Sequence, residues 1–503
     1  MENRAYNAGQ NASTLRAVGL WSFLLVFSAA LVLGLDRYTF NFTEILPCVV
    51  IVYAASRIAA LQLIGAPRLI TLCHWLFAYI FLGIAPLLQL LHGGTFPWGA
   101  RSYNDDSICL GFIAIFIGLI AFDLGCWSIR KTNAKNIFEV ASGLASRGLA
   151  QRRILILATL SIVISAVSVV ALGGLTTLFA SRVDQPHQIQ ASSADANLAL
   201  VGAVLRVPSA AAFLLLLTLM SLRRKHPFGI SGRFLLFITV PLVLLISNPL
   251  SSPRFWTGTI LLGTAFILFR WNNGRSVAIT AVGVTVIFAL VFPMADAYRT
   301  TLAVRWSDKF SEVSPSRTVA TKPDFDAVQQ VLNTVQYVDA NGFTYGKQML
   351  GTCLFWVPRS AWPNKPVSTA ILVSQGQGFA FTNVSLPLWG ELYIDGGLPL
   401  VFLGFLAYGA FITWMEQQYM RDRVTGRATF ALVFVPVFAP YEFFLLRGSL
   451  MVAVAYLFPL VALLWMGTSP YHRRQRQYAP HVALAPSLNY STQVINRIQP
   501  HGR

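Results

Sequence analysis

The residues best suited to chemistry in this sequence lie in the segment from Pro358 to Pro366, Pro-Arg-Ser-Ala-Trp-Pro-Asn-Lys-Pro. Its prolines fix φ near about −65° and lack an N–H donor, so the segment has to follow an extended path outside helices and sheets. On that path the planar fork of Arg359 matches phosphate oxygens and Lys365 supplies a compact charge, so the two could bind a phosphorylated ligand. The alternative is a rigid turn that Trp362 anchors at the level of the lipid headgroups.

Further cations fall within or at the ends of apolar segments, where a charge has to be justified. Arg206 lies roughly eight residues into its segment, about 12 Å deep at a rise of about 1.5 Å per residue. A charge at the centre of a membrane span costs about 2.5–3.5 kcal/mol, so it usually faces a cavity or a partner. Each cation alone could anchor at an interface or pair with an acid, but together they could line one cavity. The set comprises Arg206, Arg254, Arg299, Arg359, Lys365 and Arg447.

Three carboxylates are candidates for proton transfer. Glu391 and Asp395 are four positions apart, so they share one helix face and could titrate as a coupled pair that supplies a general base or acid. Glu442, near the end of a later apolar segment, is the third. Each of them could instead neutralise a nearby arginine. The sequence does not rank the three.

Metal chemistry has little support in the sequence. The seven histidines form neither an HEXXH motif nor a cluster, and the five cysteines show no CxxC spacing. Asp324-Phe325-Asp326 matches the Asp-x-Asp pattern of metal-dependent glycosyltransferases that use nucleotide sugars, but three-residue patterns recur by chance and Asp324 is well explained as a helix cap after Pro323. We therefore predict no metal and no other cofactor.

The elements that must position these residues are apolar and long. The 503 residues are 55% hydrophobic and 12% charged, with a mean hydropathy of +0.59, which indicates an integral membrane protein. We predict an all-α, polytopic membrane fold of about twelve transmembrane helices with a large periplasmic loop, because twelve stretches approach the length of a span. They are 17–35, 43–64, 69–91, 108–128, 154–172, 198–221, 234–250, 254–270, 276–295, 386–414, 428–446 and 449–467.

Basic residues distinguish the two sides of the predicted bundle. Alternate connections are rich in Lys and Arg, whereas the opposite ones are mixed in sign, and the positive-inside rule places the basic side in the cytoplasm together with both termini. Topology thus explains most of the net charge of +18, and nucleic-acid binding is not expected. The basic residues are Arg130, Lys131, Lys135, Arg147, Arg152 and Arg153; Arg223, Arg224, Lys225 and Arg233; Arg421, Arg423 and Arg427; and Arg473, Arg474 and Arg476.

This topology divides the chain into membrane and aqueous parts. In the large loop, Phe325, Val328, Leu332 and Val335 fall at helical spacing, which predicts an amphipathic helix on the bundle or membrane surface. The apolar run 349–357 is too short to span and predicts an interfacial or re-entrant segment. The parts are 1–16, a cytoplasmic N-terminus; 17–295, helices 1–9; 296–385, the periplasmic loop; 386–467, helices 10–12; and 468–503, a basic cytoplasmic tail.

The order of these features resembles the Wzy-type O-antigen, or oligosaccharide repeat unit, polymerases. The resemblance rests on the Pro358–Pro366 segment in a late periplasmic loop, on Gly390-Glu391-Leu392-Tyr393 followed by Gly396-Gly397, and on the turn Ser252-Pro253-Arg254. It covers roughly residues 250–415 with motifs and the rest of the chain by topology alone.

The resemblance implies a metal-independent, GT-C-like glycosyltransferase in the bacterial inner membrane. It would transfer the growing glycan from undecaprenyl diphosphate to a new lipid-linked repeat unit at the periplasmic face, with fixed arginines stabilising the diphosphate leaving group. Expected partners are these lipid-linked oligosaccharides, membrane lipid and, as a possible addition, a chain-length regulator protein. The implied catalytic residues are Glu391 as base, Arg254 and Arg359; the implied substrate contacts are Arg206, Arg299, Trp362, Lys365, Tyr393, Asp395, Glu442 and Arg447.

Two other functions fit the same membrane setting. An O-antigen ligase shares the lipid donor, but resemblance to that family predicts a histidine in the large loop, and residues 296–385 contain none. A flippase or transporter of lipid-linked oligosaccharides would also bind a diphosphate, but it would not need a large, proline-rich loop and should show repeated halves. The polymerase is therefore the leading hypothesis.

Overall fold

Helices account for nearly all of the regular structure in the part of the chain that the computed structural model describes. The sole sheet within that part is an antiparallel pair of two-residue strands, β1 (Gly148–Leu149) and β2 (Thr468–Ser469). The prediction of an all-α fold is thus confirmed. The described residues are 2–35, 39–66, 68–94, 96–99, 103–131, 147–171, 196–222, 229–247, 252–269, 271, 273–288 and 314–470.

Eight of the described helical segments are long and apolar enough to cross a membrane, and four further apolar helices are shorter. Each of these twelve helices overlaps one of the twelve predicted stretches, so the chain is a polytopic membrane protein. The helices are α1 (Glu2–Leu33), η1 (Phe42–Glu44) with α2 (Ile45–Ile64), α3 (Leu69–Phe77) continuing through the π-helix η2 (Ala78–Ile84) into α4 (Ala85–Leu91), α5 (Asp105–Lys131), α7 (Gln151–Ala171), α10 (Ala196–Ser221), α11 (Ile230–Ile246), α12 (Arg254–Leu268), α13 (Gly274–Val286), α20 (Leu388–Thr425), α21 (Phe430–Arg447) and α22 (Leu450–Met466).

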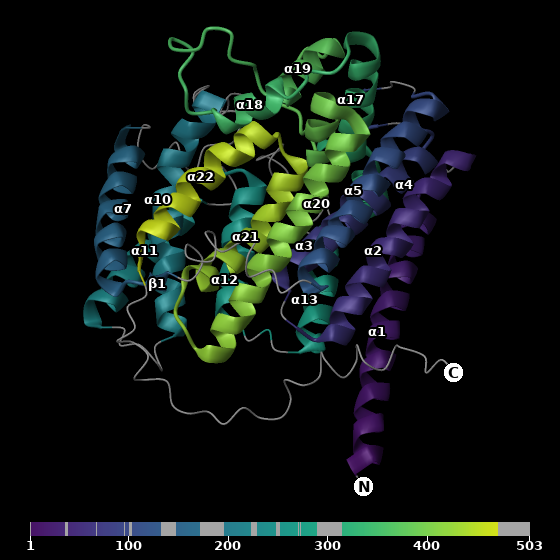
Figure 1. Cartoon of the computed structure of the whole chain (residues 1–503). Coiled ribbons are helices and arrows are strands. Elements are labelled where there is room, and N and C mark those ends of the chain that lie inside the picture. The colour runs from purple at the N-terminus through teal and green to yellow at the C-terminus, as the bar shows by residue number, and fades with distance from the viewer. Residues whose placement is uncertain are drawn as a thin grey trace.

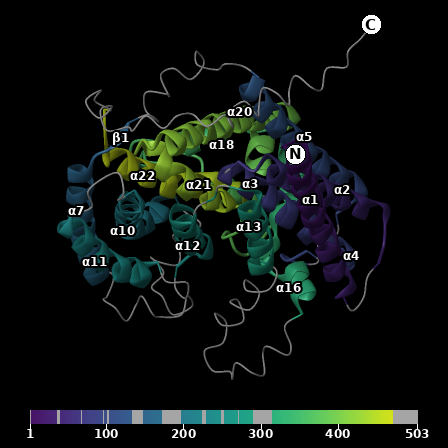
Figure 2. The same cartoon turned by 90° about the horizontal axis from the view of Figure 1, so that it is seen from below.

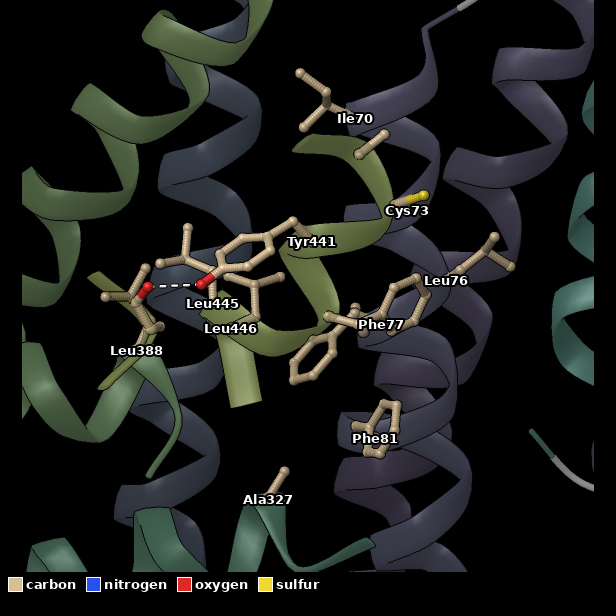
Figure 3. Close-up of a cluster of buried hydrophobic side chains, with 14 of the residues drawn as sticks. Ile70, Cys73, Leu76, Phe77, Phe81, Ala327, Leu388, Tyr441, Leu445 and Leu446 are labelled. Atoms are coloured by element: carbon tan, nitrogen blue, oxygen red, sulfur yellow. Dashed lines mark hydrogen bonds between the residues drawn. The ribbon is translucent and has the colours of Figure 1, made fainter. Parts of the chain in front are cut away.

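The core of the bundle surrounds α3, η2 and α4, in which every residue from Leu69 to Leu91 is buried. A helix that is apolar on all sides has no face to present to water, so it occupies the interior. Figure 2 shows α3 and α21 in the middle of the bundle, between α7 and α11 on one side and α1 and α2 on the other. In Figure 3, Phe77 of α3 and Tyr441 of α21 belong to one cluster of buried side chains, and the Tyr441 hydroxyl donates to the Ala453 carbonyl oxygen at 2.6 Å.

Glycines allow α5 and α20 to pack with their backbones in close approach. A Cβ atom on Gly409 would lie 2.2 Å from the carbonyl oxygen of Phe122, and one on Gly125 would lie 2.1 Å from that of Leu406. Small residues at such positions are a common means of tight helix association in membranes. The contact holds the long helix α20 against the bundle, and α20 carries two of the candidate carboxylates.

The first two turns of α20 are separated from the rest of the helix by a break at Gly396 and Gly397. Gly397 has φ of 63° and ψ of −156°, a conformation that residues with a Cβ rarely adopt. The break turns Leu388–Asp395 into a short independent helical piece. Glu391 and Asp395 both lie on it.

Short helices of the large loop cover one end of the bundle, which we call the loop face (Figure 1). α17 is the predicted amphipathic helix, and it lies against α5 and α20 with Val328 and Leu332 buried; its polar Gln330 and Asn333 are buried as well. The apolar run 349–357 is a short helix followed by a turn. The elements are α16 (Pro315–Thr321), η5 (Pro323–Phe325), α17 (Ala327–Asn341), α18 (Lys347–Cys353) and α19 (Thr369–Gly376).

The predicted basic connections meet at the opposite end, which we call the basic face. The carbonyl oxygen of Arg147 accepts from the N–H of Phe430 at the start of α21, and Arg153 donates to the carbonyl oxygen of Thr468. Arg421 and Arg423 lie at the end of α20 that reaches the same side (Figure 1). Those residues of the predicted basic connections that the structure describes thus lie away from the loop face, as the alternation along the sequence predicts.

Candidate functional site

A cavity of about 260 Å³ lies at the loop face, where α12 begins and α21 ends. Residues from α12, η5, α21 and α22 line it, together with loop residues such as Trp98 and Ser385. Its charged lining residues are Arg254, Asp324, Asp326 and Arg447. Two arginines and two aspartates therefore converge here from segments that are far apart in the sequence.

Arg254 is the first residue of α12 and follows the turn Ser252-Pro253. That turn is held by Ser252, which donates to the carbonyl oxygen of Ile246 at 2.9 Å, and Pro253 precedes the helix because it needs no N–H partner there. The Arg254 side chain is only 9% exposed, and its Nη1 donates to Asp324 Oδ2 at 2.6 Å. Asp324 keeps 28% of its side chain exposed, so it is a carboxylate that ligands in the cavity can reach.

Arg447, the last residue of α21, makes the second ion pair. Its Nη2 donates to Asp326 Oδ1 at 2.9 Å and to the carbonyl oxygen of Pro323 at 2.7 Å, and the guanidinium lies over the ring of Phe255 at 5.1 Å. The Arg447 Nε is buried and makes no hydrogen bond within the described residues. This guanidinium is therefore held in place by one acid while one of its donors stays unused.

Asp326 is completely buried and acts as a junction of the loop face. Besides Arg447, it accepts from Trp98 Nε1 at 2.6 Å, from Ser385 Oγ at 2.5 Å and from Gln330 Nε2 at 3.3 Å. The carboxylate thus ties together four separate parts of the chain. Its acceptor capacity is used by these donors, which makes it a structural acid.

Each aspartate of the Asp-x-Asp motif forms an ion pair with an arginine. No group of three or more His, Cys, Asp or Glu side chains that could hold a metal occurs among the residues the structure describes. The sequence favours a helix-cap role for Asp324, and neither Asp324 nor Asp326 is among the predicted site residues. The motif itself was the available signal, but only the fold shows that Arg254 and Arg447 face it.

Arg206 lies behind one wall of the cavity. It is 3% exposed, and its Nη1 is 3.4 Å from the hydroxyl of Tyr456, which lines the cavity, and 3.5 Å from the carbonyl oxygen of Gly202. Its Nε makes no hydrogen bond, and no carboxylate pairs with it in the described part of the chain. A buried charge in a span usually faces a cavity or a partner, and Tyr456 lies between Arg206 and this cavity.

Glu391 and Asp395 are buried and have separate sets of donors. Glu391 accepts from Thr369 Oγ1, from Ser449 Oγ at 3.3 Å and from the N–H of Leu450 at 2.7 Å. It therefore caps α22, and since Ser449 lines the cavity, the carboxylate lies just behind the cavity wall. The donors to Asp395 are Thr344 Oγ1 and the N–H groups of Gln348 and Met349, at 3.2 and 2.7 Å for the two N–H groups, so it caps α18.

Glu442 lies in the core and does not line the cavity. Its Oε1 accepts from Tyr408 at 3.0 Å and is 3.1 Å from His74 Nδ1, so the cluster joins α3, α20 and α21. Glu442 and His74 are both fully buried. Tyr393, another predicted contact, is 6% exposed and packs at 6.0 Å from the ring of Phe343.

Both cations of the Pro358–Pro366 segment donate to backbone carbonyl oxygens of the same loop. Lys365 is 5% exposed, and its Nζ donates to the carbonyl oxygens of Phe355 and Val357 at 2.5 and 2.9 Å. Arg359 Nη1 donates to the carbonyl oxygen of Lys365 at 2.7 Å. Arg359 is exposed and Trp362 half-buried, and none of the three lines the cavity. Arg299, the remaining predicted contact, lies outside the described residues.

Comparison with known proteins gives no relative for this chain: no protein-family model, curated protein or solved structure matches it.

Proposed function

We propose that this chain is a metal-independent glycosyltransferase of lipid-linked oligosaccharides, of the O-antigen repeat-unit polymerase type. The observation that carries the proposal is the convergence of Arg254 and Arg447 on one cavity of a polytopic membrane protein, with Arg206 behind its wall. The cavity, at about 260 Å³, is slightly smaller than typical small-molecule sites of about 300–1,000 Å³. It suits a diphosphate and the adjoining sugar, with the rest of the glycan outside.

The arginines suit the leaving group of such a reaction. When the acceptor hydroxyl attacks the anomeric carbon, the bond between that carbon and the diphosphate oxygen breaks, and the electron pair leaves with the lipid diphosphate. Preorganised guanidinium groups stabilise the charge that develops on that oxygen. Arg254 and Arg447 are already held in fixed positions by Asp324 and Asp326, so little reorganisation is needed as the bond breaks.

Asp324 is the carboxylate we assign as proton acceptor. It lines the cavity and is partly exposed, whereas Glu391 lies behind Ser449 with its oxygens taken by three donors. As Asp324 takes the proton of the acceptor hydroxyl, its charge is neutralised, and Arg254 becomes available to the departing diphosphate. Glu391 then has the role of positioning Ser449 and the start of α22.

The proposed orientation follows from the charges. The basic face lies in the cytoplasm with both termini, and the loop face lies in the periplasm of a bacterial inner membrane. The donor and acceptor would then be undecaprenyl-diphosphate-linked oligosaccharides that reach the cavity from the outer leaflet. A chain-length regulator would contact the same membrane domain.

The test is deletion of the gene followed by separation of the surface glycans by size. Single repeat units on the lipid core indicate a lost polymerase and support the proposal. Polymer stranded on its carrier would identify a ligase, and little surface glycan of any length would identify a flippase; either outcome overturns the proposal.

Complementation with point variants tests the residue assignments in the deletion strain. Asp324→Asn is expected to give no long chains at a normal protein level. The control variant Arg421→Gln, on the basic face, should complement the deletion and give long chains as the wild type does. If Glu391→Gln abolishes long chains in a normally folded protein and Asp324→Asn does not, Glu391 is the base. Arg359→Ala tests the predicted catalytic role of the Pro358–Pro366 segment, and wild-type chain lengths would exclude it.

A further inference from the structure

A second cavity, of about 400 Å³, lies at the basic face. It is bounded by the last turn of α10, the end of α12, the last turns of α20 and the start of α21. The first cavity lies where α12 begins and α21 ends, so the two are at opposite ends of the same helices. The glycosyltransferase proposal makes no use of this second cavity.

Arg423 is the cation of the second cavity. Its Nη1 donates to the hydroxyl of Tyr419 at 3.0 Å and to the carbonyl oxygen of Trp271 at 3.5 Å, and its guanidinium lies 5.5 Å from the centre of the Tyr419 ring, so neighbouring groups orient it. Asp422 also lines the cavity, but it is 4% exposed and accepts from Thr429 Oγ1 at 2.6 Å, which fastens α20 to α21. The charge that this cavity presents to a ligand is therefore positive.

A described basic residue next to the cavity adds to this charge. Gly426, which lines the cavity, is followed by Arg427, and the positive charges of Arg421 and Arg427 both act on Asp422. The complementary ligand is therefore an anion.

The remaining walls are apolar and continuous with the outside of the bundle. Phe266 is buried at 2%, while Leu268 and Phe269 of the same wall are 47% and 64% exposed. Exposed phenylalanine and leucine at the end of a membrane-spanning helix face acyl chains. A ligand of this cavity therefore has both an anionic group and an apolar chain, and basic pockets between membrane helices on the cytoplasmic side are known to take lipid headgroups.

We propose that the cavity between α10, α12, α20 and α21 binds an anionic phospholipid of the leaflet at the basic face. The headgroup phosphate contacts Arg423, and one acyl chain lies against Phe266 and Phe269. This site is separate from the donor site at the loop face. It stands whether or not the chain is a glycosyltransferase.

The experiment measures the thermal stability of the purified, delipidated full chain in detergent. The probes are phosphatidylglycerol, phosphatidylcholine with the same acyl chains, and glycerol 3-phosphate. Phosphatidylglycerol is expected to raise the melting temperature of the wild type, while the other two probes do not. Arg423→Gln should lose at least half of that shift relative to its own lipid-free baseline. Arg421→Gln is the matched control. It removes the same charge two positions earlier in the chain, and Arg421 is exposed and does not line the cavity.

A second variant keeps the proposal testable if Arg423→Gln folds poorly. Ser221→Phe fills the cavity and leaves Arg423 in place, and it should lose the phosphatidylglycerol shift as well. The proposal is overturned if both variants keep the full shift, if Arg421→Gln loses as much as Arg423→Gln, or if the wild type shows no shift. An equal shift with phosphatidylcholine or with glycerol 3-phosphate overturns it too, because the first shows no need for the charge and the second no need for the chains.

Discussion

Asp324 and Asp326 are two positions apart, but the same change to asparagine is expected to have opposite consequences at the two. Asp326 is completely buried and accepts from four side chains, one of them the guanidinium of Arg447. Asp324 is 28% exposed and pairs with Arg254 at the cavity. Asp326→Asn should therefore reduce stability, and Asp324→Asn should reduce activity.

The magnitudes follow from burial. Removing one partner of a buried ion pair leaves an uncompensated charge, which costs about 3–5 kcal/mol. Asparagine at 326 leaves the charge of Arg447, which is only 14% exposed, without its carboxylate. It also places an amide N–H₂ among groups that are already donors. Asp324→Asn should lower the free energy of unfolding by less, because the side chain at 324 is 28% exposed and its amide can donate to water.

The assay is reversible unfolding of the purified protein in mixed micelles, followed by tryptophan fluorescence, with glycan chain length measured in parallel. Trp98, one of twelve tryptophans, donates to Asp326, so part of the change in emission comes from this junction. If the two variants lose equal stability, or if Asp326→Asn loses less than about 1 kcal/mol, the assignment of Asp326 as the structural acid is refuted. If Asp324→Asn keeps full polymer length, the assignment of Asp324 as base is refuted.

Three further outcomes test other parts of the structure. Lys365→Met should expose the loop after α18 to limited proteolysis, because it removes the donor to two carbonyl oxygens, and Arg359→Gln should have a smaller effect; equal cleavage of wild type and Lys365→Met would contradict this. Gly409→Ala should destabilise the protein by about 1–3 kcal/mol, since its Cβ meets a backbone oxygen of α5. Gly258→Ala, with open space at its Cβ, is the matched control and should be nearly neutral in the same unfolding assay. Arg206→Met should weaken binding of a lipid diphosphate, measured by native mass spectrometry, while Arg233→Met on the basic side should not.

The spans were predictable because hydropathy depends on residues that are neighbours in the sequence. All twelve apolar stretches correspond to apolar helices, and the amphipathic helix after Pro323 is present as α17. The burial of α17 on its polar side was not predictable, since Gln330 is buried through its contact with Asp326, which depends on how the loop packs.

The ion pairs of the site could not be predicted from the sequence. The pairs Arg254–Asp324 and Arg447–Asp326 join residues about 70 and 121 positions apart, and no local pattern reports such contacts. In the Pro358–Pro366 segment, the sequence shows the charges but not their partners. Its composition predicts a binding motif, while in the fold Lys365 is buried against carbonyl oxygens of its own loop. Charge shows that a residue needs a partner but does not show which partner it has.

The break in α20 connects the bundle with the large loop. The helical piece before Gly396 caps α22 through Glu391 and α18 through Asp395, so it contacts both the bundle and the loop. A change of the backbone angles at Gly397 would tilt this piece and shift Ser449 at the cavity wall, while the long part of α20 stays packed against α5. The width of this cavity would thus be set by the dihedral angles of one glycine.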